Sequence, residues 1–296
     1  MPQATQNIDR PLILDRNRLG DFSVPAASGR DKIHIDTAKN VHGVYLYLTI
    51  AGVAATEAEI KAQVGTIRVY VGSVMIWELT ATEILDLFHY YTDKFAVFTV
   101  AGVLPLRFTP FMLPLNESTR SYALGMLNDR DPSKRNTFEI EVNMTAGPIT
   151  IDACEVHLET DQFPSMGIGY HTRWLRYGST WAAASKQTLD KIPVESNCLA
   201  AYGYHFNEAQ TISRVNLKVN DVVRINDQPN DLLLQKLHEA GRIPQTGYTH
   251  LDFSLENDPR AFLDLSRLVN QYLDVTWAVA PAAYDLLLQK LFLNLN

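Results

Sequence analysis

Short runs in which apolar and polar residues alternate account for most of the chain. In Phe138–Met144 every second residue is apolar and polar residues lie between them, which is the pattern of a strand with one buried face. The runs are rich in β-branched and aromatic residues and are interrupted by Gly, Pro, Asn and Asp, so the sequence predicts an all-β fold. Strands are expected near residues 43–50, 66–71, 74–80, 96–103, 122–127, 137–144 and 149–159, and near residues 199–207, 213–219, 222–226, 249–255, 261–265, 272–279 and 284–295.

One arrangement of elements occurs twice. Ile67–Tyr91 has the pattern of a strand, a tight turn, a second strand and a short amphipathic helix, and Val215–Ala240 has the same pattern. The turns, Gly72-Ser73 and Asn220-Asp221, are residue pairs that tolerate the positive φ values of a two-residue hairpin connection. Because the two copies are about 148 residues apart, half the length of the chain, they indicate two domains of one kind.

The ends of the two halves also match each other. Phe138–Ile151 and Leu273–Leu288 each have the pattern of a strand, a proline-containing turn and a further strand. We expect a bulge near Cys154–Glu155, because the alternation changes phase there. The residues expected to cap the two helices at their N-termini are Thr80 or Thr82 in the first copy and Asp227 or Asn230 in the second.

About seven or eight strands in each half predict two tandem eight-stranded antiparallel jelly rolls, each with a short helix after its first hairpin. The expected division is an N-terminal arm over residues 1–36, a first jelly roll over 37–160, a linker over 161–193 and a second jelly roll over 194–296. The linker is rich in Tyr and Trp, which is unusual for a free tether, so we expect it to pack between the domains.

Charge and composition exclude several classes of function. The 296 residues include 26 basic and 33 acidic side chains, and a net charge of -7 argues against direct nucleic-acid binding. Basic and acidic residues balance in the arm, so a polybasic tail is not indicated. No apolar run of about 18 residues and no signal-peptide pattern occurs, so we expect folding in a cytosol with Cys154 and Cys198 as reduced thiols.

The sequence lacks the common motifs of catalysis. G-x-S-x-G, H-E-x-x-H, P-loop and C-x-x-C patterns are missing and the eight histidines are scattered, so we expect no catalytic residue, no cofactor and no enzyme activity. One acidic loop offers oxygen atoms that a structural calcium ion could use, and its candidate ligands are Asp252, Glu256 and Asp258. A turn at Asn257–Pro259 explains the same residues without a metal, and both interpretations stay open.

The order of elements resembles that of a known group of viral proteins. In Thr66–Tyr91 and Ser213–Gly241, and again in Thr137–Glu159 and Tyr272–Leu295, the layout is similar to the double jelly-roll major capsid proteins of tailless icosahedral bacteriophages with an internal membrane, the corticovirus and tectivirus type. The resemblance covers about 85% of the chain and includes no short invariant motif.

The resemblance implies a coat protein of the virion, assembled in the host cytoplasm as a pseudo-hexagonal homotrimer. Its implied partners are neighbouring capsid trimers, the viral internal membrane and minor capsid proteins. The hairpin-helix units Val74–Tyr91 and Val222–Ala240 are then expected near subunit contacts, and the N-terminal arm is expected to face the membrane or a neighbouring trimer.

Two other functions are compatible with tandem jelly rolls. One is a glycan-cleaving enzyme with carboxylates at the domain interface. The other is a carbohydrate-binding or tail-associated module that uses a patch of exposed aromatic residues. The four tryptophans fall in separate elements, and Trp77 and Trp277 have the pattern of core residues, so the sequence shows no such patch.

Overall fold

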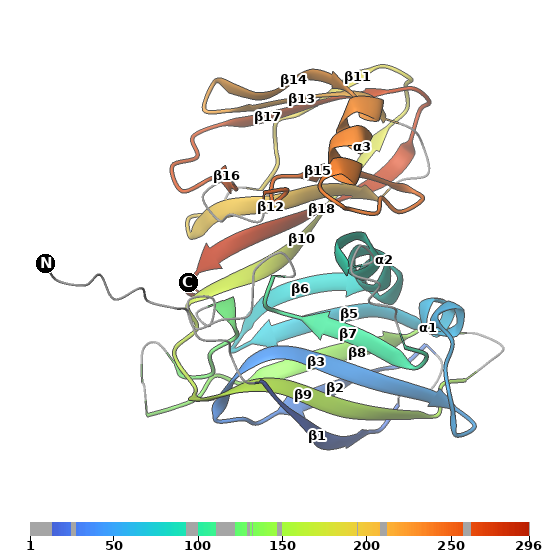
Figure 1. Ribbon diagram of the computed structural model, residues 1–296, viewed down its shortest axis with the longest axis vertical. Coiled ribbons are helices and arrows are strands. Elements are labelled where there is room, and N and C mark those ends of the chain that lie inside the picture. The colour runs from blue at the N-terminus through green and yellow to red at the C-terminus, as the bar shows by residue number, and fades with distance from the viewer. Residues whose placement is uncertain are drawn as a thin grey trace, which may run out of the picture.

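The computed structural model describes residues 14–24, 28–92, 100–110, 122–128, 131, 133–146, 150–193, 195–207, 212–256 and 262–295. Within these residues the chain forms two β-barrels that are stacked along the long axis of the molecule, with short helices beside them (Figure 1). The all-β fold expected from the sequence is confirmed. Among the described helices none has both the length and the apolar character needed to cross a membrane.

The first barrel contains the elements up to residue 164. They are β1 (Leu14–Phe22), β2 (Arg30–Ile35), β3 (Lys39–Ile50), β4 (Val53–Ala54), α1 (Glu57–Gln63), β5 (Val64–Val71), β6 (Val74–Thr80), α2 (Ala81–Thr92), β7 (Val103–Arg107), β8 (Phe138–Met144) and β9 (Ala153–Pro164). One wall has the strand order β1-β9-β3-β7, with β4 also paired to β3, and the facing wall has the order β2-β8-β5-β6.

The second barrel contains the elements from residue 170 onward. They are β10 (Tyr170–Trp181), β11 (Lys186–Leu189), β12 (Cys198–Asn207), β13 (Ile212–Val219), β14 (Val222–Pro229), α3 (Asn230–Glu239), β15 (Tyr248–Asp252), β16 (Leu263–Asp264), β17 (Gln271–Trp277) and β18 (Ala282–Leu293). Its walls have the orders β10-β18-β12-β15 and β11-β17-β13-β14, and the short strand β16 pairs with β12.

The two strand orders are the same when elements are matched in chain order. β1, β9, β3 and β7 correspond to β10, β18, β12 and β15, and β2, β8, β5 and β6 correspond to β11, β17, β13 and β14. Each helix, α2 or α3, follows the last strand of its hairpin directly. Both barrels are therefore jelly rolls of one topology, and the duplication predicted from the sequence is confirmed.

A single sheet runs through both barrels. β10 pairs with β18 along its whole length and also lies parallel to β6, with Trp174 opposite Trp77. One wall of the first barrel is thereby joined to one wall of the second, which gives a continuous nine-stranded sheet. The pairing of β10 with β18 runs along the whole strand, whereas its pairing with β6 is a single parallel bridge at Trp174 and Trp77.

Each barrel encloses its own apolar core. Along β3, for example, Val44, Leu46 and Leu48 are buried while Tyr45 and Tyr47 face outward, as the period of a strand requires. The largest buried side chain of the second core is Trp277. A smaller third cluster joins α2 to β12 and β18 between the barrels.

The structure corrects the expected domain boundaries. Residues 14–36, expected to be an arm, contain β1 and β2, and β1 is paired with β9 from Leu14 to Phe22. Residues 161–193, expected to be a linker, contain β10 and β11, which are the first two strands of the second barrel. The expected packing of this segment between the domains is nevertheless found, because β10 contacts both barrels. Residues 1–13 lie outside the described part of the chain.

Some expected strands differ from those in the structure. Tyr122–Leu127 forms only isolated bridges. Of the strand expected near residues 96–103, residues 96–99 lie outside the described residues, residues 100–102 are not in a strand, and β7 begins at Val103. The bulge expected at Cys154–Glu155 is also wrong, since both β1 and β3 pair regularly with β9 there. β9 begins only at Ala153, so the change of phase marks the start of the strand.

The hairpin and helix signals are mostly confirmed. Gly72, Asn220 and Asp221 all have positive φ, as the tight turns require. Thr80 caps α2, as expected. In the second barrel neither Asp227 nor Asn230 is the cap, because α3 starts after Pro229 without a side-chain capping hydrogen bond.

Candidate functional site: the junction between the barrels

The two barrels meet at helix α2. This helix contacts β5, β6 and β7 of its own barrel and also hydrogen-bonds to residues of the β10-β18-β12-β15 wall of the second barrel (Figure 1). Nine of its twelve residues are buried. A helix on the surface of one domain buries a single stripe, so burial on both sides identifies α2 as an element shared by the two barrels.

Glu83 connects the start of α2 to the second barrel. Its backbone N–H donates to Thr80 Oγ1 and its carboxylate accepts from Thr80 N, at 3.2 and 2.8 Å, which is a capping box. The same carboxylate accepts hydrogen bonds from Arg176 of β10 and, at 2.9 Å, from Asn207 of β12. Arg176 also pairs with Asp285 of β18.

Charge balance at this contact favours the ion pair. Burial lowers the pKa of Arg176, but the carboxylates of Glu83 and Asp285 outweigh that effect and raise it. The guanidinium therefore stays charged between two carboxylates. Such a pair stabilises little when intact, but removing one partner leaves a buried charge, so it strongly disfavours any other arrangement of the barrels.

Two tyrosines connect the end of α2 to the second barrel. Tyr90 donates to Asp252 of β15 at 2.9 Å, and Tyr91 donates to Gln289 of β18 at 2.7 Å. Arg242, in the loop after α3, donates to the same carboxylate oxygen of Asp252 at 2.8 Å. Burial, with the nearby Asp252 carboxylate as a further cause, raises the pKa of both tyrosines well above the ordinary value, so both keep their hydroxyl protons.

A buried histidine pair completes this network. The Nδ1 atoms of His205 and His250 are 2.7 Å apart, so one must donate to the other and the accepting ring must be neutral. Tyr90 stacks on the His250 ring with centroids 4.0 Å apart. Burial, with Arg242 as a further cause, lowers the pKa of His205 to about 4 despite the attraction of Asp252. Burial also lowers the pKa of His250.

An assignment of protons follows from the contacts. Tyr91 has given its only hydrogen to Gln289, so the 3.4 Å contact with His205 Nε2 requires the histidine to donate there. His205 Nδ1 then accepts from His250 Nδ1–H. The Nε2 atom of His250 is then unprotonated and has no hydrogen-bond partner among the described residues. An unpaired acceptor at this buried position costs less free energy than an unpaired N–H donor would.

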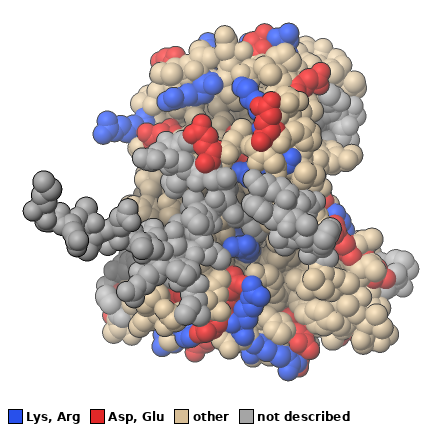
Figure 2. Space-filling view, viewed as in Figure 1, with Lys and Arg blue, Asp and Glu red and all other residues tan. Residues whose placement is uncertain are grey.

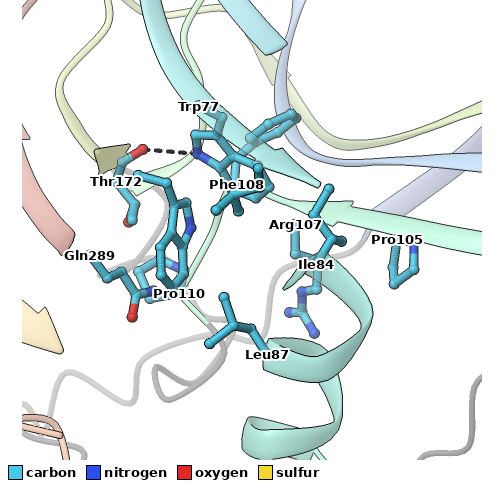
Figure 3. Close-up of a pocket in the computed structure, with 11 residues that line it drawn as sticks. Trp77, Ile84, Leu87, Pro105, Arg107, Phe108, Pro110, Thr172 and Gln289 are labelled. Carbon is cyan, nitrogen blue, oxygen red and sulfur yellow. Dashed lines mark hydrogen bonds between the residues drawn. The ribbon is translucent and has the colours of Figure 1, made fainter. Parts of the chain in front are cut away.

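The tryptophans Trp77 and Trp174 form the third contact between the barrels. Their ring centroids are 6.5 Å apart in an edge-to-face arrangement, and Trp77 Nε1 donates to the carbonyl of Thr172 at 3.1 Å (Figure 3). Beside them lies a cavity of about 20 Å³, lined also by Leu87 and Gln289. This volume suits about one water molecule, so the cavity is too small for a substrate.

A larger hollow lies on the outer face of the first barrel. It has a volume of about 520 Å³ and is lined by residues of the β1-β9-β3-β7 wall, among them Tyr45, Tyr47 and Arg107, and also by Phe88 of α2. The hollow lies on the β1-β9-β3-β7 wall of the first barrel. This wall corresponds to the β10-β18-β12-β15 wall of the second barrel, which α2 contacts. Trp77, Trp174 and Trp277 are buried elsewhere, so this hollow contains no tryptophan among its described lining.

The residues suggested as calcium ligands are not grouped in the described structure. Asp252 is buried and its carboxylate accepts from Tyr90, Arg242 and Ser254. Glu256 is exposed, and Asp258 lies outside the described residues. Within the described ranges no three His, Cys, Asp or Glu side chains are close enough to hold a metal ion. The cation next to Asp252 is the guanidinium of Arg242.

The two cysteines are free thiols buried inside separate barrels, as expected. Burial raises the pKa of Cys154 to about 12 and that of Cys198 to about 11. Neither is therefore a reactive thiolate at neutral pH. On the face shown in Figure 2, the described Lys and Arg residues are interspersed with Asp and Glu over both barrels, so the described part of this face has no extended basic surface.

Comparison with solved structures identifies the fold that contains this junction. The major capsid protein P2 of bacteriophage PM2 has 13% sequence identity and a TM-score of 0.78, with 94% of this chain and 98% of that chain covered. The chain has the double jelly-roll capsid fold. The STIV major capsid protein gives a TM-score of 0.64 at 13% identity, with 94% of this chain and 96% of that chain covered. The PBCV-1 virus capsid gives 0.61 at 9%, with 95% and 94% covered.

A sequence comparison supports the same assignment for the second half of this double jelly roll. Residues 171–284 match the family model of the viral coat protein P2 C-terminal domain. The matched range runs from β10 to the start of β18 and so lies within the second barrel. No curated protein matches the chain in sequence.

The junction is the part of this fold that sequence reasoning missed. The contacts made by His205, His250 and Arg242 join strands and loops far apart in the chain, and no spacing rule brings them together. One signal was present, because the first helix continues into Tyr90-Tyr91 where the second continues into Glu239-Ala240. Comparison of the two copies identifies the first helix as the one with a second buried face.

Proposed function

We propose that the chain is the major capsid protein of an icosahedral virus, with a structural and non-enzymatic role in the virion shell. The observation that carries the proposal is the fixed junction between two barrels of one topology. The P2 coat-protein match over the second barrel and the capsid fold of the whole chain support it.

The junction explains what a shell protein gains from duplication. A tiling unit needs walls at a defined angle, and here that angle is fixed by one shared helix, one continuous sheet and several buried polar contacts. Each buried polar pair disfavours other orientations, because turning the barrels would leave a charge or donor unpaired. The two walls of one chain therefore behave as one rigid block.

Three such blocks arranged about a threefold axis present six similar barrels. This homotrimer would fill a hexagonal position of an icosahedral lattice with a single kind of chain. The partners in that case are other copies of the trimer and whatever lines the inner surface of the shell, including an internal membrane and minor capsid proteins. Assembly takes place in the host cytoplasm.

Mass measurement of the purified protein tests the proposal. Three chains of 33.3 kDa correspond to a trimer of about 100 kDa, which we expect by sedimentation velocity and native mass spectrometry at micromolar concentration. A particle of 33 kDa that persists at all concentrations, with or without added salt, would contradict it. Hydrolysis of glycan substrates by the purified protein would favour the enzyme instead.

A further inference from the structure

The chain turns towards the first barrel after the last strand of the second. β18 ends at the boundary between the two barrels (Figure 1), and Asn294 and Leu295 follow it. We propose that these two residues, the strap, hold the second barrel on the first while His171 is neutral, and that the strap is released when His171 binds a second proton. The strap lies within one chain, so this inference does not depend on how the chain assembles.

Backbone geometry directs the strap onto the first barrel. Asn294 has a φ of 62°, in the left-handed region that asparagine adopts more readily than most residues. Its N–H donates at 3.2 Å to the carbonyl of Gly169, which lies in the connection between the barrels. Leu295 is half-buried and packs against the apolar core of the first barrel.

Leu295 contacts the turn between β5 and β6. A Cβ atom added to Gly72 of that turn would lie 3.9 Å from Leu295 Cδ1, which is ordinary van der Waals contact. The N–H of Gly72 donates to the carbonyl of Thr137 at 2.7 Å, so the turn itself is fixed to the first barrel. The strap is therefore a contact between the barrels in addition to α2 and the shared sheet.

Arg173 of β10 binds the backbone of the strap. Its Nη2 atom donates to the carbonyls of Asn294 and Leu295, at 3.3 Å each. Its guanidinium also lies over the ring of Phe292, with Cζ 4.3 Å from the ring centroid. Because one nitrogen atom binds two successive carbonyls, a small displacement of the guanidinium breaks both hydrogen bonds.

His171 positions Arg173. The Nε–H group of Arg173 donates to His171 Nε2 at 3.0 Å. Arginine has no acceptor and stays protonated, so Nε2 must be the unprotonated nitrogen of His171. The single proton of the ring is then on Nδ1, which lies 3.3 Å from the carbonyl oxygen of Gly169. The closed strap thus requires a neutral His171.

A second proton on His171 is incompatible with this arrangement. It would place an N–H group of an imidazolium against the N–H group of the Arg173 guanidinium, and both rings of atoms would be positively charged. Arg173 must then move away from His171. Its hydrogen bonds to both carbonyls of the strap are lost, and Leu295 keeps only its apolar contact with the first barrel.

The charges around His171 favour the neutral ring. Lys290, in the next row of β18, pairs with Glu195 at 3.4 Å, so this carboxylate is already engaged. Cys198 of β12 is close by, and its thiol is neutral because burial raises its pKa to about 11. Burial, with Arg173 as a further cause, lowers the pKa of His171 to about 4.

Hydrogen exchange of the Asn294 amide tests the strap, because this N–H is bonded to Gly169 when the strap is closed. The pKa of His171 is lower in the closed state than the ordinary value of about 6.5, so the released state binds more protons, and release is favoured as the pH falls from 6.5 towards 4. We expect the protection of the Asn294 amide in the purified protein to fall by about thirtyfold between pH 8 and pH 5. Peptides from β13 should stay strongly protected at both pH values.

His171→Gln separates the strap from other effects of acid. A glutamine can accept from Arg173 and donate to Gly169 without titrating, so the strap should stay closed at both pH values. His205→Gln, at the buried histidine of the junction, is the matched control and should keep the thirtyfold loss expected for the parent, or about that. Arg173→Gln should lose the protection of the Asn294 amide already at pH 8.

Two results would overturn the proposal. One is equal protection of the Asn294 amide at pH 8 and pH 5 in the parent, and the other is a loss in His171→Gln as large as in the parent. Exchange of β13 together with Asn294 would indicate global unfolding in place of strap release and would also overturn it. Circular dichroism checks that Arg173→Gln is folded, and if it is not, the comparison of His171→Gln with the parent decides alone.

Discussion

Acidification is expected to weaken the folded protein through the buried histidines at the junction. His205 is completely buried with a pKa of about 4, against about 6.5 for an unfolded chain. Since its folded pKa is the lower one, the unfolded state binds more protons below pH 6.5, and stability falls as the pH drops from 6.5 towards 4. At pH 5 the loss relative to pH 8 is about 2 kcal/mol for this residue.

The variant His205→Gln isolates that contribution. A glutamine amide can accept from His250 and donate to Tyr91, so hydrogen bonding can be kept while the titrating group is removed. Urea unfolding at pH 8 and pH 5, at one fixed protein concentration and followed by tryptophan fluorescence, gives the free energy of unfolding for each variant. The difference between the two pH values should be about 2 kcal/mol smaller in the variant than in the parent.

Between pH 5 and pH 7 the stability changes through protonation of histidines and not through protonation of carboxylates. Groups with lowered carboxyl pKa, such as Asp161 and Asp274, lose their contribution only as the pH falls below about 4. His171 is also buried, with a pKa of about 4, so the variant should retain part of the pH dependence. The variant His238→Gln, at an exposed histidine of α3, is the control. A His205→Gln protein with the full pH dependence of the parent would refute this reasoning.

Three further outcomes are expected. Glu83→Gln should lower the free energy of unfolding by about 2 kcal/mol in urea titrations, because Arg176 keeps only Asp285 as a charged partner, while the exposed Glu256→Gln should have no effect. Deletion of residues 1–22 should abolish soluble folding, as judged by circular dichroism, because it removes β1 and leaves the edge of β9 unpaired; a folded deletion protein would show that β1 is dispensable. Cys154 and Cys198 should react with iodoacetamide at pH 8 only after urea is added, and labelling of the native protein would contradict their burial.

The repeated hairpin and helix were predictable because their signals are local. A tight turn needs residues that accept positive φ, and Asn220 and Asp221 both adopt it. An amphipathic helix directly after the hairpin is likewise visible in the spacing of its leucines. From those two features the jelly-roll topology and its duplication follow, since chain order fixes which strands correspond.

The first strand of each barrel was missed for the opposite reason. β1 has an exposed edge and polar residues on both faces, as in Arg16, Asn17 and Arg18, so it lacks the alternation of a half-buried strand. β10 has the sequence pattern of a linker because its outward residues, such as Trp174, are covered by the other barrel and lack the polar character of a solvent-exposed face. Strands whose surroundings are supplied by distant segments do not show the period of an isolated sheet.

The junction could not be predicted because its contacts join groups that have no sequence relation. Asp252, proposed as a calcium ligand, lies instead beside Arg242 and Tyr90. The acidic residues of a loop can be recognised in a sequence, but a guanidinium that reaches them from another loop cannot. Which side chains contact each other at the boundary of two domains depends on how the two domains are oriented.

The central claim is that three chains present six similar barrels, and electron microscopy of the purified assembly tests it most directly. Class averages viewed along the symmetry axis should show a ring of six lobes with threefold symmetry, in which the lobes are joined in three adjacent pairs, each pair being one chain with the junction described above. Isolated particles of two lobes, or closed rings with a number of lobes other than six, would contradict the account.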